Sequence, residues 1–171
     1  NDSISGTYDP AMVLLDFLRN EKHLSGTKEG CREGDCGACT VLIGTMIKGQ
    51  VVYQTANSCL LPLANVHNKH VVTIEGITPG EMTPVQHAFV YEGATQCGFC
   101  TPGFIVSLTG YLINADYADM EDAKDSIAGN ICRCTGHAAI IRAAQSVVTE
   151  MNDVFAKPDR IGSLIGKGYL P

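Results

Sequence analysis

The sequence of 171 residues has no tryptophan, no run of basic residues and no apolar stretch of membrane-spanning length. The lack of a Lys/Arg-rich segment, together with a formal net charge of −6, argues against a nucleic-acid-binding surface. The longest apolar run, residues 103–113, is interrupted by Ser107, Thr109 and Gly110, so we expect no transmembrane helix. Because no signal peptide begins the chain, we expect a cytoplasmic location, or a periplasmic one if an upstream targeting segment is missing.

Cysteine, by contrast, is abundant, with eight residues. An even count permits a disulfide framework. The segment Cys132-Arg133-Cys134 argues against one, because each sulfur would need a partner elsewhere although a single residue separates them. Such tight spacing, in a chain with enough apolar residues for an ordinary core, favours metal ligation instead. The cysteines form two sets of four: Cys31, Cys36, Cys39 and Cys59, then Cys97, Cys100, Cys132 and Cys134.

The first set has the spacing C-x4-C-x2-C followed by a distant fourth cysteine, which is the plant-type [2Fe–2S] pattern. A cluster bound by four thiolates is anionic, so backbone N–H groups must converge on the sulfurs. Glycine permits that close approach and a positive φ, and Gly30, Gly34 and Gly37 flank or separate the cysteines. Lys28 and Arg32 add positive charge nearby. A zinc site is the alternative, although two short knuckles are its usual form.

The second set combines a C-x2-C pair with a C-x-C pair, and the one-residue gap suits adjacent ligands on a tight turn. Zinc with this combination is again the alternative. Cys100 immediately precedes Thr101, and Cys134 immediately precedes Thr135, where helices are expected to begin. Both sulfurs would then lie at helix N-termini, whose free N–H groups favour an anionic cluster. A Rieske-type site is not favoured, because it needs two histidines and only His137 is near.

The composition changes along the chain from β-type to helical. Runs rich in β-branched residues, bounded by glycine, predict strands at residues 40–44, 51–55 and 71–76. Asp9 is expected to cap a helix that has Pro10 at its first position. Helix starts are expected at Thr83-Pro84, at Thr101-Pro102, at Asp119 and at Thr135 or Gly136, and a short helix at 161–165.

These elements predict an α+β chain in which a small α+β domain is followed by an all-α four-helix domain. The expected boundaries are 1–77 for the first domain, 78–84 for a linker, 85–156 for the second domain and 157–171 for a tail.

With both cysteine sets interpreted, the chain resembles the two-[2Fe–2S] iron–sulfur subunit or domain of the molybdenum hydroxylases, the xanthine dehydrogenase/aldehyde oxidase family. The resemblance covers roughly residues 14–144 and accounts for all eight cysteines. It implies a plant-type ferredoxin-like β-grasp domain and a four-helix domain, each holding one cluster. The matching stretches are "GTKEGCREGDCGACTV", "NSCLLPL", "TIEGI", "PVQHAFV", "QCGFCTPGF" and "GNICRCTGH".

The resemblance also implies roles for the candidate residues. The first cysteine set would ligate the cluster nearer the flavin, and the second set the cluster nearer the molybdenum. Gln96 and Cys134 match positions that approach the pterin of the molybdenum cofactor, and an amide such as that of Gln96 both donates and accepts. His137 departs from the family pattern, since many relatives carry Tyr there. The resemblance also leads us to expect a strand before Asn1, and the tail resembles a linker into a flavin domain.

The function implied is electron transfer, from a molybdopterin centre through two [2Fe–2S] clusters to FAD, with no catalytic residue on this chain. Partners would be a molybdopterin-binding large subunit and an FAD-binding subunit or domain, in a hetero-oligomer that is often a dimer of heterotrimers. The "EGDC" sequence favours the xanthine dehydrogenase branch. The alternatives are an aldehyde oxidoreductase, a carbon monoxide dehydrogenase, another heteroaromatic hydroxylase, or a stand-alone ferredoxin-type carrier.

Overall fold

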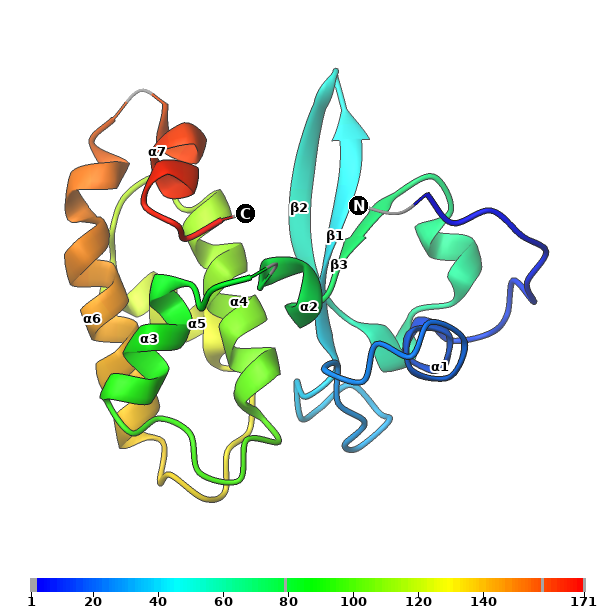
Figure 1. Ribbon diagram of the computed structural model, residues 1–171, viewed down its shortest axis with the longest axis horizontal. Coiled ribbons are helices and arrows are strands. Elements are labelled where there is room, and N and C mark those ends of the chain that lie inside the picture. The colour runs from blue at the N-terminus through cyan, green and yellow to red at the C-terminus, as the bar shows by residue number, and fades with distance from the viewer. Residues whose placement is uncertain (1–2, 79, 158, 171) are drawn as a thin grey trace.

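The computed structural model describes residues 3–78, 80–157 and 159–170. A small sheet with its surrounding loops lies beside a helical half, which confirms the α+β architecture (Figure 1). The expected domain limits at residues 1 and 171 lie outside the described residues, as does residue 79 of the expected linker. Within the described part of the chain, none of the helices is long and apolar enough to span a membrane.

The sheet has three antiparallel strands in the order β2-β1-β3. They are β1 (Thr40–Ile47), β2 (Gln50–Asn57) and β3 (His70–Val72). Each overlaps one of the three predicted β-type runs. In the central strand, Leu42 pairs with Thr55 on one side and with Val72 on the other. Three short helical segments follow β2 and β3: η2 (Ser58–Leu60), η3 (Leu63–Val66) and α2 (Ile74–Ile77).

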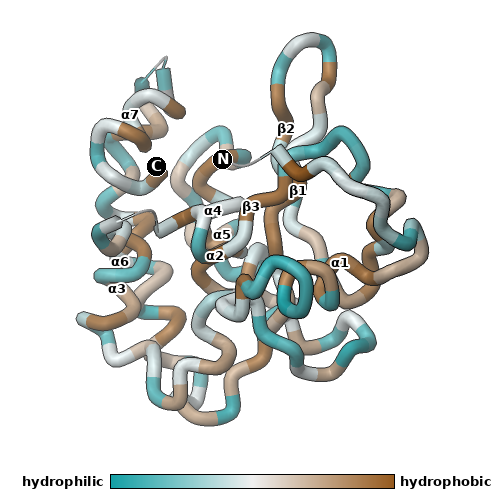
Figure 2. The backbone as a smooth tube through the Cα atoms, turned by 45° about the vertical axis from the view of Figure 1, so that its right-hand side comes forward, coloured by the Kyte–Doolittle hydropathy of each residue, from teal (hydrophilic) through white to brown (hydrophobic). Residues whose placement is uncertain are grey.

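Both faces of β1 are buried, because successive side chains of a strand point to opposite sides. Val41 and Ile43 pack with Leu14 and Phe17 in a small core on one face. Leu42 points the other way and belongs to the large core of the helical half. The central part of β1 is accordingly a hydrophobic stretch inside the molecule (Figure 2). The strand therefore joins the two halves through packing.

The first helix begins later than the sequence predicted. It comprises α1 (Leu14–Asp16), which continues as a π-helical turn, η1 (Phe17–Glu21). Asp9 does not cap it, because its carboxylate caps a preceding turn and Val13 is extended and pairs with Pro62. That pairing, between residues far apart in the sequence, holds the chain out of the helical conformation until Leu14.

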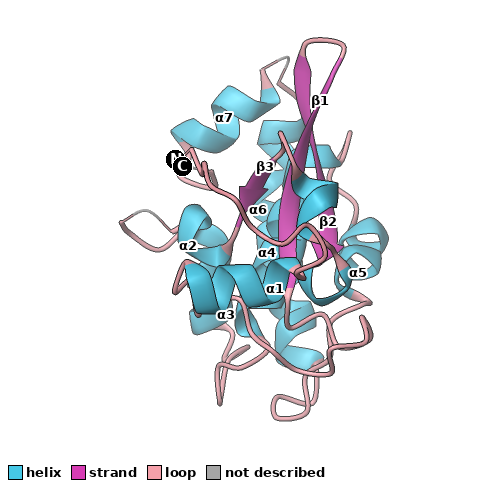
Figure 3. Cartoon of the chain, turned by 90° about the vertical axis from the view of Figure 1, so that its right-hand side faces the viewer, coloured by secondary structure: helices cyan, strands magenta, loops and turns pink. Residues whose placement is uncertain are grey.

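The helical half is arranged around one central helix, α4, whose residues 103–112 are all buried. The helices are α3 (Pro84–Tyr91), α4 (Thr101–Asn114), α5 (Met120–Ile127), α6 (Ala138–Phe155) and α7 (Arg160–Gly166). α3 and α5 pack against α4, α6 packs against α3 and α5, and α7 packs against α6 (Figures 1 and 3). α3 to α6 correspond to the four predicted helices, and α7 to the short one expected in the tail.

Local capping explains most of the helix starts. Thr83 and Gln86 form a reciprocal capping box at α3, with Pro84 at the first helical position. Asp119 caps α5 as predicted. α6, however, begins at Ala138 and not at 135 or 136. Gly136 and His137 have φ values of 65° and 70°, and this left-handed conformation cannot belong to a right-handed helix.

The two halves meet closely where α4 crosses the sheet. A Cβ atom built on Gly110 would lie 2.9 Å from Thr55 Cγ2 and 3.0 Å from Leu42 Cδ2. The absence of a side chain there lets α4 lie directly against β1 and β2. This contact and the shared core fix the loops at the lower end of both halves relative to each other (Figure 1).

Candidate functional site

The two cysteine sets lie at the same end of the molecule, on loops at the bottom of Figures 1 and 3. The first loop precedes β1, and Cys59 lies in η2 directly after β2. The second set lies on the loop between α3 and α4 and on the loop between α5 and α6. Each set therefore combines segments that are distant in the sequence.

In the first loop, backbone N–H groups face the sulfurs. Cys31 Sγ accepts a hydrogen bond from the N–H of Glu33, and Cys36 Sγ accepts one from the N–H of Cys31, both at 3.4 Å. The bond from Glu33 lowers the pKa of Cys31 to about 7, against the opposing effect of burial. A cysteine ligates a metal as a thiolate, and these N–H bonds stabilise the thiolate form of Cys31.

The other two sulfurs of this set are neighbours in a buried position. Cys39 and Cys59 pack together with Leu15. Ser58 fixes their separation, since both its N–H and its hydroxyl donate to the carbonyl of Cys39. Burial raises the pKa of Cys59 to about 11, and the neighbouring thiols of Cys39 and Cys31 raise it further. The four sulfurs thus converge as two pairs, Cys31 with Cys36 and Cys39 with Cys59.

The predicted glycines shape this loop. A Cβ on Gly30 would lie 2.7 Å from Cys36 Sγ, so a side chain there would displace the sulfur. Gly34 and Gly37 have φ values of 85° and 66°, in the left-handed region that glycine adopts readily. The N–H of Gly34 also donates toward Cys59 and lowers its pKa, against the larger effect of burial. All three glycines therefore serve the conformation of the loop.

The two nearby cations also have other bonding partners in the loop. The Arg32 guanidinium forms ion pairs with Asp16 and Glu29, whose carboxylates neutralise it. The ammonium group of Lys28 donates to the carbonyl of Ser25. Both side chains hold the loop to its surroundings. The groups that bond directly to Cys31 and Cys36 Sγ are backbone N–H groups.

In the second set the sulfurs again form two pairs. Cys97 and Cys134 are exposed, with their sulfurs 3.6 Å apart. Their contact raises the pKa of Cys134. Cys100 and Cys132 are half-buried neighbours, and burial raises the pKa of Cys100 to about 12. In the part of the chain that is described, no three His, Cys, Asp or Glu side chains form a single-ion metal site.

Only one of the two expected helix N-termini carries a cysteine of the set. Cys100 is the N-cap residue of α4, as predicted. Cys134 lies four residues before the start of α6, because Gly136 and His137 delay that helix. The sulfurs of this loop are stabilised by other groups: the hydroxyl of Thr135 lies 3.1 Å from Cys132 Sγ. Burial raises the pKa of Cys132, but hydrogen bonds from Thr135 and Cys134 outweigh it and the net shift is downward.

The residues expected to approach a pterin lie together at the exposed edge of the second set. Gln96 is exposed and adjacent to Cys97, whose sulfur contacts that of Cys134. The ring centroid of His137 lies 5.7 Å from that of Phe104, a core residue of the helical half. Gln96 and Cys134 are thus both accessible, and Cys97 connects them.

The loops of the two sets are bonded directly to each other, which the sequence did not predict. The N–H of Ile131, next to Cys132, donates to the carbonyl of Cys36 at 3.0 Å. Ile131 and Thr135 both lie in the "GNICRCTGH" stretch, between and beside the cysteines. Thr135 contacts its neighbours Cys132 and His137, whereas the bond of Ile131 reaches a distant segment that cysteine spacing does not reveal.

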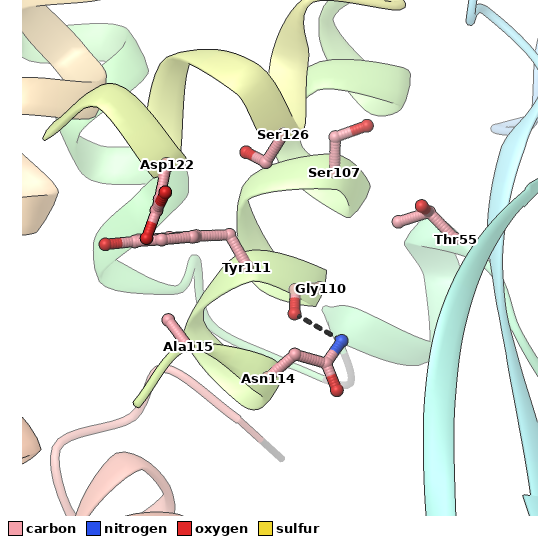
Figure 4. A pocket seen from close by; sticks show the side chains of 8 residues that line it. All are labelled: Thr55, Ser107, Gly110, Tyr111, Asn114, Ala115, Asp122 and Ser126. Atoms are coloured by element: carbon pink, nitrogen blue, oxygen red, sulfur yellow. Dashed lines mark hydrogen bonds between the residues drawn. The ribbon is translucent and has the colours of Figure 1, made fainter. Parts of the chain in front are cut away.

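A separate cavity of about 290 Å³ lies between the sheet and the helices α4 and α5. Several of its polar lining side chains bond within the protein. The amide of Asn114 donates to the carbonyl of Gly110 (Figure 4) and to that of Tyr53, and Tyr111 donates to the carbonyl of Asp119. The chemistry of the molecule is therefore concentrated at the sulfur loops.

Comparison with known families matches each half of the chain to an iron–sulfur domain. Residues 7–63 match the family described as a 2Fe-2S iron-sulfur cluster binding domain, and residues 73–145 match a second [2Fe-2S] binding domain family. Each match contains one complete cysteine set. The two matches support one [2Fe–2S] cluster in each half.

Curated relatives are much longer proteins. The chain is 44% identical over 142 residues to a xanthine dehydrogenase of Blastobotrys adeninivorans, covering 81% of this chain and 10% of the relative. It is 42% identical over 142 residues to aldehyde oxidase 3 of Mus musculus, covering 81% of this chain and 11% of the relative. The chain thus spans about a tenth of the length of the curated relatives it matches.

Solved structures match over most of the chain. A chain of quinoline 2-oxidoreductase from Pseudomonas putida is 34% identical with a TM-score of 0.71, and 85% of this chain matches 86% of that chain. The aldehyde oxidoreductase from Desulfovibrio gigas is 35% identical with a TM-score of 0.75, and 91% of this chain matches 16% of that chain. The fold of this chain therefore occurs both as a separate chain and within a longer polypeptide.

Proposed function

Because the chain belongs to the molybdenum hydroxylase family as its two-[2Fe–2S] iron–sulfur part, we propose that it carries electrons in series between a molybdopterin centre and FAD. Each cluster supplies a one-electron redox centre. The chain's own residues bind the two centres, exclude water from the buried sulfurs and hold the two loops in contact. The oxidation of the organic substrate takes place on a partner chain or domain.

The paired sulfurs support the proposed ligand sets. A [2Fe–2S] cluster is held by four thiolates, two for each iron, so a suitable site presents two pairs of sulfurs. Both cysteine sets have this arrangement, and inward-facing amides surround the first. Thiolate donors fit iron–sulfur chemistry in addition to zinc, and the family matches favour iron. The proposed pairs are Cys31 with Cys36, Cys39 with Cys59, Cys97 with Cys134, and Cys100 with Cys132.

The hydrogen bond between Ile131 and Cys36 is the observation that carries the proposal of transfer in series. It links the backbone next to Cys132 with that of Cys36 through one 3.0 Å contact. Two independent carriers would have no reason to bond their cluster loops to each other. A stand-alone ferredoxin-type carrier needs only one centre and one exposed face, and this contact favours the two-centre path over it.

The proposed order of the two clusters is supported by the exposure of the second cysteine set and by the resemblance to the family. Gln96 and Cys134 form the accessible edge of the second set, which we propose faces the pterin of the molybdenum cofactor. The amide of Gln96 has both a donor and an acceptor for a pterin edge. The first set, at the other end of the path, would then face FAD. Electrons would leave the chain through the loop at residues 31–39.

The proposed partners are a molybdopterin-binding large subunit or domain and an FAD-binding subunit or domain, assembled in the cytoplasm as a hetero-oligomer. A periplasmic location remains the alternative. Among substrates, the relatives named xanthine dehydrogenase favour a purine, and those named aldehyde oxidase favour an aldehyde. Neither substrate would contact this chain, because the sulfur loops provide the functional surface.

Metal analysis of the native complex tests the proposal. We expect about four iron atoms and as many acid-labile sulfides per chain, since each [2Fe–2S] cluster contains two of each. Reduction with dithionite should bleach the visible absorption and give two distinct EPR signals. Molybdenum and FAD should copurify. A colourless protein containing zinc would contradict the cluster assignment, and an iron-only monomer would indicate the ferredoxin-type carrier.

A further inference from the structure

Asn130 is a buried polar residue that connects three segments of the chain, and its side chain is 6% exposed. Its Oδ1 accepts a hydrogen bond from the hydroxyl of Ser107, in α4, at 2.8 Å. Its Nδ2 donates to the carbonyl of Gly37, in the first sulfur loop, at 3.0 Å. The residue itself lies in the second sulfur loop, two positions before Cys132. One carboxamide thus joins both sulfur loops to the central helix.

The segments around Asn130 are packed backbone against backbone. A Cβ on Gly37 would lie 2.5 Å from the carbonyl oxygen of Gly129, and one on Gly103 would overlap the carbonyl of Gly37. The Gly37 carbonyl also accepts hydrogen bonds from the N–H and hydroxyl of Thr40. This oxygen is therefore held in place from several directions. The side chain of Asn130 occupies the narrow space that remains.

Two consecutive residues of one loop bond to two consecutive residues of the other. Asn130 bonds to Gly37 through its side chain, and Ile131 bonds to Cys36 through its backbone N–H. Ile131 is itself 57% exposed, so its side chain contributes little to holding this contact. The geometry points to the following inference, which rests on the proposed function: Asn130 is a positioning residue that sets the separation of the two clusters by fixing the Ile131–Cys36 contact.

The substitution Asn130→Asp tests this inference because it changes one atom and almost no volume. The oxygen that replaces Nδ2 would face the Gly37 carbonyl, so the donated bond becomes a repulsion, while Ser107 retains an acceptor. We expect hydrogen exchange of the peptide containing the Ile131 amide to accelerate on the order of tenfold or more, which corresponds to one unsatisfied buried group. In the complete native protein with both clusters reduced, the magnetic interaction between the two EPR signals should also weaken.

A matched control separates positioning from general stability. Thr109→Val removes a buried hydroxyl in α4, the helix of Ser107. That hydroxyl donates to the carbonyl of Ile105, within the helix and away from both sulfur loops. The substitution should lower the melting temperature without changing the magnetic interaction or the exchange at Ile131. Ser107→Ala removes the other bond of Asn130 and should have a smaller effect than Asn130→Asp.

The outcomes distinguish this inference from the proposed function. If the unaltered protein shows no pair of [2Fe–2S] signals, the proposed function fails. If both signals are present, and Asn130→Asp retains the original magnetic interaction and the original exchange at Ile131, only the role of Asn130 is refuted. Should Asn130→Asp not accumulate with both clusters, Asn130→Ser removes the same donor with a neutral side chain and is scored by the same two measurements.

Discussion

The hydroxyl of Thr135 lies 3.1 Å from the sulfur of Cys132 and 3.2 Å from the N–H of His137, from which it accepts a hydrogen bond. The hydroxyl proton is thereby left to donate to the sulfur. A bond donated to a thiolate ligand stabilises the more negative, reduced state of a cluster. Thr135 should therefore tune the reduction potential of the second cluster.

Thr135→Val should lower that potential by a few tens of millivolts, given that a tenfold change in a one-electron equilibrium is about 59 mV. The measurement is a redox titration followed by EPR, which resolves the two clusters in one sample. Thr135→Ser keeps the hydroxyl and should restore the original value. If the reduction potential of the second cluster depended on the size of the side chain at position 135 and not on its hydroxyl, the proposed hydrogen bond from Thr135 would be contradicted.

Cys134→Ser should disrupt the second cluster and leave the first intact, because its sulfur belongs to the pair with Cys97. We expect loss or broadening of one EPR signal, a fall in iron content, and no electron transfer from molybdenum to flavin. The reciprocal variant Cys59→Ser should remove the other signal. Survival of both signals unchanged in Cys134→Ser would show that the ligand assignment is wrong.

The features predicted correctly from the sequence are those encoded locally. The capping residues Thr83 and Asp119 act on helices that begin immediately after them, so spacing and residue type suffice. The cysteine sets are defined by ligand spacing, and their glycines lie within the same loop. These local signals gave the α+β architecture and the order of its elements, while the domain limits and the cysteine ligands stay predictions.

The features that were missed or wrong depend on distant contacts or on backbone conformation. The bond from Asn130 to Gly37 joins residues 93 positions apart, and no pattern in the sequence marks it. The pairing of Val13 with Pro62 displaced the first helix start for the same reason. The helix predicted to begin directly after Cys134 begins later because His137 has a left-handed conformation, which a non-glycine residue rarely adopts.

Gly103→Ala should destabilise the junction between α4 and the first sulfur loop. The added Cβ would overlap the Gly37 carbonyl, a backbone atom that cannot rotate away. Overpacking of this kind costs about 1–3 kcal/mol, and the cost should appear as a lower free energy of unfolding in urea. Gly129→Ala is the matched control, since its Cβ would meet nothing within 4 Å. Equal loss in both variants would argue against a steric origin.

Stability should also decline at alkaline pH through Tyr169. Its side chain is 2% exposed and donates to Glu150 Oε2 at 2.7 Å, and burial raises its pKa well above the usual value. The unfolded phenol ionises near pH 10 and the folded one only at higher pH. The contribution of Tyr169 to the free energy of unfolding is thus complete below pH 10. It is lost as the pH rises from there through the pKa of Tyr169 in the folded protein.

Tyr169→Phe should therefore flatten the fall in unfolding free energy above pH 10, while lowering stability at neutral pH through loss of the bond to Glu150. Part of the alkaline decline should persist, because burial also raises the pKa of Tyr53 and Tyr111. Tyr91→Phe removes an exposed phenol and serves as the control. Urea unfolding between pH 7 and pH 11 measures the effect, and an unaltered profile in Tyr169→Phe would contradict it.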